Sequence, residues 1–142
     1  MVLASGHLHV SETWVVFEEA QRRGVKRLIF THPEDIVDAS LNDVRGVAAM
    51  GAMVEHSLAF FLEGSKFKTR SAEDMRQQIE AAGVESTILC SDLGQVGVFS
   101  PLEGFRGAVE LCFDLGYRDE DIHKMVSSNA ARVLGLETLV SS

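Results

Sequence analysis

Cysteine, proline and basic residues are scarce in this chain of 142 residues. With two cysteines and two prolines, a disulfide framework is excluded, and the low cysteine content favours a cytoplasmic location. The 13 Lys and Arg residues stand against 21 Asp and Glu residues, which gives a formal net charge of −8. Such an acidic surface repels phosphate backbones, so we expect no nucleic-acid partner.

Long apolar runs are also absent. The longest, around residues 47–50, is much shorter than a membrane span. Residues 1–6 lack the basic region and the apolar stretch of a secretory signal. We therefore expect no membrane partner. The 46% hydrophobic and 24% charged residues are typical of a globular protein, and we predict one domain spanning residues 1–142.

Short apolar runs alternate with helical patterns along the chain. Strands are predicted over residues 1–5, 26–31, 52–55 and 86–90. Helices are predicted from Ser11 to Gly24 and over residues 42–50, 71–83, 100–115 and 119–134. This alternation predicts an α/β fold in which parallel strands are joined by right-handed crossovers.

Serine residues mark the start of several predicted helices. Ser11 is a candidate N-cap for the first helix. Ser71 with Asp74 resembles a capping pair at the start of the third. Ser100 with Glu103 forms a capping box, and Pro101 stands at the first helical position, which is a strong helix start.

Residues that bind metals or transfer protons follow each predicted strand. These are His7 with His9, then His32, Glu55 with His56, and Asp92. In parallel α/β folds the carboxyl ends of the strands meet at one edge, where the functional loops converge. Of the 5 histidines, His123 alone falls away from this edge, on the last predicted helix.

Each of these residues also has a purely structural interpretation. His7 and His9 are consistent with a mobile terminus. His32 precedes Pro33 and is consistent with turn chemistry. His56 is in a position to open a helix, and Asp92 to fix the turn with Gly94.

A divalent metal gives this set of residues a common chemistry. The imidazoles of His7 and His32 and the carboxylate of Asp92 suit zinc first, with manganese, iron and nickel as alternatives. A bound divalent ion lowers the pKa of its water to about 7. Asp92 is then placed to accept the proton of that water as a general base and to pass it to the leaving group.

Three stretches and the tail resemble the carboxyl-terminal half of the amidohydrolase superfamily, the metal-dependent hydrolases built on a (β/α)₈ barrel. The stretches are SGHLH (residues 5–9), FTHP (30–33) and LCSD (89–92), and the tail is MVSSNAARVLGL (125–136). The resemblance implies a TIM-like half-barrel of about four strands with a final extra helix. It also implies that His7, His32 and Asp92 end strands five, six and eight, as two metal ligands and the base linked to the metal.

The chain departs from the family pattern in three places. Ala130 replaces the proline of the usual Asn-Pro-Ala motif in the tail. The His-x-His pair of the family's first strand and the lysine of its fourth strand have no counterpart, unless His7 and His9 form that pair and the first strand is strand one. A complete barrel takes about 250 residues. We therefore expect a homo-oligomer of half-barrels, a missing amino-terminal half, or a truncated chain.

The leading hypothesis is a metal-dependent hydrolase, or a decarboxylase-type lyase of the same superfamily, that acts on a small molecule. The alternative is a catalytically incomplete half-barrel or assembly module that lacks the amino-terminal metal ligands. A third possibility is a flavodoxin-like module with a phosphate near Gly94 and Gly97, although these glycines lack the dinucleotide-binding spacing. The substrate and the roles of His9 and His56 stay open.

Overall fold

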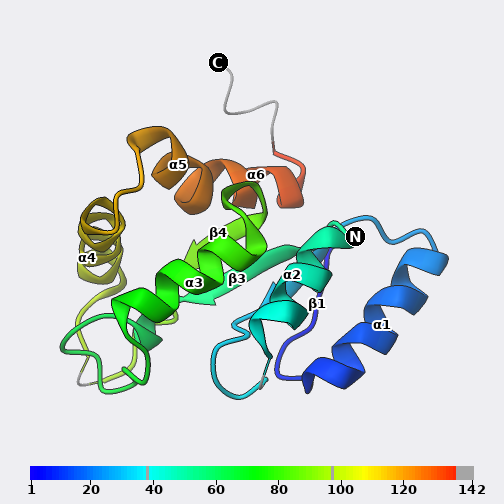
Figure 1. The fold of residues 1–142 in the computed structure, drawn as a ribbon, viewed down its shortest axis with the longest axis horizontal. Coiled ribbons are helices and arrows are strands. Elements are labelled where there is room, and N and C mark those ends of the chain that lie inside the picture. Colours follow the sequence, from blue (N-terminus) through cyan, green and yellow to red (C-terminus); the bar gives the residue numbers. More distant parts are fainter. Residues whose placement is uncertain (38, 97, 137–142) are drawn as a thin grey trace.

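The computed structural model describes residues 1–37, 39–96 and 98–136, and it has four parallel strands that alternate with helices (Figure 1). The strands are β1 (Leu3–Ala4), β2 (Leu28–Thr31), β3 (Met53–Ser57) and β4 (Thr87–Cys90). The helices are α1 (Val10–Arg22), α2 (Leu41–Ala49), α3 (Ala72–Ala82), α4 (Pro101–Asp114), α5 (Asp119–His123) and α6 (Asn129–Leu134), with short helical turns η1 (Leu58–Phe60), η2 (Val84–Ser86) and η3 (Lys124–Ser128). The predicted α/β fold class is confirmed.

The strands form one open sheet in the order β1-β2-β3-β4, so each strand pairs with its neighbour in sequence. All three pairings are parallel. Because a parallel pair needs a crossover connection, a helix separates consecutive strands. The carboxyl ends of the four strands therefore share one edge, which carries the candidate site.

Side-chain caps position the helices that flank this edge. Capping boxes start α2 at Ser40, α3 at Ser71 and α4 at Ser100, each with an acidic residue three positions later. The predictions for Ser71 and Ser100 are confirmed. The prediction for Ser11 is wrong by two residues, because the His9 ring accepts a hydrogen bond from the Ser11 N–H and caps α1.

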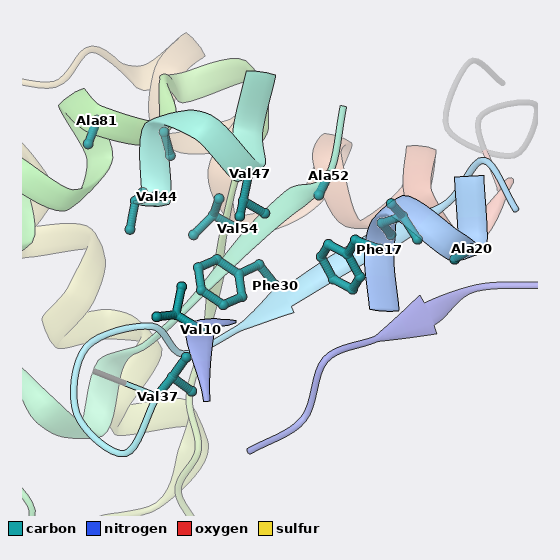
Figure 2. Close-up of a cluster of buried hydrophobic side chains, with 12 residues drawn as sticks. Val10, Phe17, Ala20, Phe30, Val37, Val44, Val47, Ala52, Val54 and Ala81 are labelled. Atoms are coloured by element: carbon teal, nitrogen blue, oxygen red, sulfur yellow. The ribbon is translucent and has the colours of Figure 1, made fainter. Parts of the chain in front are cut away.

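One face of the sheet packs against α1, α2 and α3. Phe30 and Val54 project from β2 and β3 into this layer, where Phe17 of α1 and Val47 of α2 meet them, and all four are fully buried (Figure 2). Burying an aromatic side chain of this size contributes about 1.5–3 kcal/mol. This cluster fixes the helices against β2 and β3.

The opposite face is covered only in part. At the amino end of the strands, Met53 and Ile88 pack against Ala130 and Val133 of α6. Toward the carboxyl end, Glu55 and Cys90 stay partly accessible on this face. The open part of the sheet therefore lies beside the edge that carries the candidate site.

The last helical segment differs from the single helix predicted over residues 119–134. It is divided into α5, a π-helical turn η3, and α6, which ends at Gly135 in the left-handed conformation (φ 75°). The buried Asn129 side chain donates to the carbonyl oxygens of Val84 (2.8 Å) and Thr87 (2.7 Å) and so ties α6 to the start of β4.

Strand boundaries differ from prediction at β1, β2 and β3, and β2 begins at Leu28, two residues later than predicted. β1 is shorter than the predicted residues 1–5, because only Leu3 and Ala4 pair with β2. β3 extends to Ser57, so the idea that His56 opens a helix is wrong. No helix of the described residues has both the length and the apolar character needed to cross a membrane.

Candidate functional site

The first two predicted ligands lie side by side at the carboxyl edge of the sheet. β1 and β2 are adjacent, and Gly6 turns the chain after β1 with φ 57°, a conformation that glycine adopts without strain. His7 follows this turn, and His32 follows β2 directly. The centroids of the two imidazole rings are 4.7 Å apart and the ring planes are inclined by 51°.

His32 is held firmly but keeps a free ring nitrogen. Its backbone N–H donates to the Glu55 carbonyl oxygen (2.7 Å), and its ring meets the Phe60 ring edge-on at 6.0 Å between centroids. The side chain is 7% exposed, and its Nδ1 atom has no hydrogen-bond partner. An unpaired buried nitrogen costs free energy. This nitrogen is therefore available to a ligand.

Backbone strain marks both His32 and Asp92. Within the described ranges they are the two non-glycine residues with positive φ, 23° for His32 and 49° for Asp92. Such conformations cost about 1–3 kcal/mol each and persist where the surroundings impose them, often at functional sites. Both strained residues are members of the predicted metal site.

Asp92 follows β4 and is oriented by β3. The hydroxyl of Ser57, which is fully buried, donates to Oδ2 of Asp92 over 2.9 Å. The Asp92 side chain itself is exposed. One carboxylate oxygen is thus fixed by the sheet, while the residue as a whole is exposed, so a water molecule can reach it.

Glu55 lies on β3, between β2, which precedes His32, and β4, which precedes Asp92. Its side chain is on the partly open face of the sheet. Burial raises the pKa of its carboxyl group above the ordinary value, the charge of nearby His32 acts against that rise, and the charge of Asp92 adds to it. Burial of the neighbouring Cys90 raises the pKa of its thiol, and the charge of Glu55 adds to that rise.

His56 points away from this group. It is fully buried, and its Nδ1 atom bonds to Oε1 of Glu34, which is 2% exposed. In a strand, successive side chains point to opposite faces, so β3 sends Glu55 to the partly open face and His56 with Val54 toward the helices. Sequence reasoning missed Glu34, since nothing local indicates a partner 22 residues away.

The imidazole pair fits a divalent cation, but the set is incomplete. Two imidazoles bonded to one zinc ion at about 2.0–2.1 Å have ring centroids about 5 Å apart, close to the observed separation. In residues 1–37, 39–96 and 98–136, however, no three His, Cys, Asp or Glu side chains converge tightly enough to hold a metal. The structure therefore brings His7 and His32 together but does not join Asp92 to them in one group of ligands.

Residues 1–55 match the model of a family of unknown function (DUF6282). The matched segment contains His7, His32 and Glu55 and ends before Asp92. No curated protein matches the chain. The similarity therefore covers the imidazole pair and assigns it no reaction.

Proposed function

We propose that this chain carries the carboxyl-terminal part of a metal-dependent hydrolase site of the amidohydrolase type, which acts on a small molecule. His7 and His32 are the proposed metal ligands, and Asp92 is both a ligand and the general base. The observation that supports this best is the pairing of the two imidazoles, with the buried Nδ1 of His32 left without a partner.

The proposed chemistry divides between the cation and the chain. A bound divalent ion, zinc before manganese, iron or nickel, would supply Lewis acidity and a more acidic water. Asp92 accepts the proton of the attacking water and returns it to the leaving group. Ser57 holds one oxygen of Asp92 during both transfers, because its hydroxyl donates to Oδ2.

We further propose that the site is completed by a second half-barrel, either another copy of the chain or an amino-terminal half. β1 and β4 are the edges of the four-stranded sheet, and unpaired strand edges are ready to pair with another chain. The partly open face beside Glu55 is the side on which the missing ligands would approach.

The second candidate function is a catalytically incomplete half-barrel or assembly module. It is favoured by the lack of a third converging ligand in the part of the chain that the structure describes. The two candidates differ in one measurable respect: the incomplete module is expected to hydrolyse no substrate, whether it is a monomer or an oligomer.

A hydrolysis assay on the protein loaded with zinc or manganese separates the two. Lactones, cyclic amides and phosphotriesters are suitable probes, assayed beside the mass of the protein in solution. We expect hydrolysis by an assembled species. Asp92→Asn should lower kcat by about 10²–10⁴-fold, the usual contribution of a general base.

The matched control is His123→Ala, since His123 lies on α5 and bonds to Ser128. It should leave hydrolysis unchanged. Hydrolysis that survives Asp92→Asn would contradict the assigned base, and its absence from every metal-loaded assembly would favour the incomplete module.

A further inference from the structure

The end of β3 holds the segment of residues 32–34 at two points. The Glu55 carbonyl oxygen accepts a hydrogen bond from the His32 backbone N–H over 2.7 Å. The next residue, His56, directs its side chain to the opposite face of the sheet, where its Nδ1 atom bonds to Oε1 of Glu34. Two adjacent residues of one strand therefore fix the chain on both sides of Pro33.

The pair of His56 and Glu34 is enclosed in the core. His56 is 0% exposed and Glu34 is 2% exposed, and a guanidinium N–H of Arg70 donates to the Glu34 carbonyl oxygen as well. Taking an imidazole and a carboxylate out of water is costly, and well-packed apolar side chains of similar volume often stabilise a core equally well or better. Stability alone therefore does not account for this pair.

The conformation of His32 depends on this arrangement. Its φ of 23° is strained for a residue other than glycine, and such strain persists only where the surroundings over-determine it. Because the ring of Pro33 fixes φ at that position, few free dihedral angles separate the anchored Glu34 from His32. Release of Glu34 would let the His32 backbone relax to negative φ and move its imidazole away from that of His7.

We infer that His56 and Glu34 are positioning residues, which hold the strained backbone of His32 and thereby keep its ring centroid 4.7 Å from that of His7. Ser57, the next residue of β3, orients the Asp92 carboxylate in a comparable way through its hydroxyl. The expected effect on metal binding rests on the proposed function, whereas the expected effect on the imidazole pair does not.

The variant that tests this role removes both partners, His56→Leu together with Glu34→Met. Replacing both members of a buried pair by apolar groups of similar shape is nearly neutral for stability, so this double variant should fold. Proton NMR of the metal-free chain reports the geometry through the nuclear Overhauser effect between the rings of His7 and His32. We expect this effect in the wild type and its loss in the double variant.

Pro33→Gly releases His32 in a second way, because it keeps the pair but frees the dihedral angles between Glu34 and His32. The Overhauser effect between the two imidazoles should be lost in this variant as well. Its test does not depend on whether the double variant folds.

Calorimetric titration with zinc measures the consequence for the proposed metal site. The apparent affinity falls with the fraction of molecules that hold the competent conformation, and we expect zinc binding about tenfold or more weaker in the double variant. A wild type that binds no zinc would defeat the proposed function, but the NMR comparison would still decide the inference about His56 and Glu34.

Two further variants separate positioning from stability. His56→Asn keeps an N–H near the position of Nδ1 but leaves a cavity, so it should lower the melting temperature and still retain the Overhauser effect and zinc binding. The control is Val54→Ala, which removes apolar volume from a fully buried position on the same face of β3. It should also lower the melting temperature and leave both readouts unchanged.

The alternative is a pair that only stabilises the core. In that case the double variant and Pro33→Gly keep the Overhauser effect and the zinc affinity of the wild type. Retention of the effect in either variant, or its loss in folded His56→Asn, would overturn the inference.

Discussion

Replacing Asn129 by Ala should weaken the attachment of the carboxyl-terminal helix α6 to β4, the strand that precedes Asp92. The Asn129 side chain is 2% exposed and donates to two carbonyl oxygens, of Val84 and Thr87. Each lost hydrogen bond is worth about 0.5–1.5 kcal/mol, and leaving a buried carbonyl unsatisfied adds to that cost. The higher helix propensity of Ala offsets about 0.5 kcal/mol of this loss in stability. We expect a net loss of about 3 kcal/mol in the free energy of unfolding.

The assay is urea denaturation followed by circular dichroism, with thermal melting as a second measure. At about 4 °C per kcal/mol for a domain of this size, the melting temperature should fall by roughly 12 °C. Asn42→Ala is the matched control, since Asn42 is exposed and bonds only to Arg45 among the described contacts. It should change stability by less than about 0.5 kcal/mol. If Asn129→Ala costs no more than this control, the anchoring role is refuted.

Three further predictions concern the core, the carboxyl group at the site and the thiols. Phe30→Ala should cost about 3–5 kcal/mol in urea denaturation, because Phe30 is fully buried; a loss under about 1 kcal/mol would contradict the packing in Figure 2. Glu55 has a raised pKa in the folded state, so the folded state binds more protons and stability should fall as pH rises from the unfolded pKa of about 4.3 through the folded pKa. Glu55→Gln should flatten this slope in denaturation curves measured from pH 4 to pH 8, and an unchanged slope would show that Glu55 is not its source. Burial raises the pKa of the Cys112 thiol to about 11 and raises that of Cys90 as well, so neither should react with iodoacetamide at pH 8 until the protein unfolds; rapid labelling of the folded protein would contradict this.

Helix starts were predictable because their signals are local. Ser71 with Asp74, and Ser100 with Pro101 and Glu103, carry the whole capping interaction within four residues. The start of α1 was misplaced because histidine is not among the preferred N-cap residues, yet the ring of His9 fills that role. The ends of β1 depend on pairing with β2, a contact that no local pattern specifies.

The candidate site was predictable where the backbone alone determines position. The rule that parallel strands share a carboxyl edge placed His7 beside His32 correctly. The rule does not say which of Glu55 and His56 lies on the open face of the sheet. A strand that is buried on both faces has no alternation of apolar and polar residues that would distinguish its two faces. The partnership of His56 with Glu34 and the support of Asp92 by Ser57 depend on tertiary packing.

Calorimetric titration of the protein with zinc tests the central proposal most directly, in the wild type and in His7→Ala, His32→Ala, Asp92→Asn and the control His123→Ala. We predict saturable binding that weakens by about tenfold or more in each of the first three variants and stays unchanged in His123→Ala. No saturable binding, or binding that His7→Ala and His32→Ala leave intact, would contradict the account.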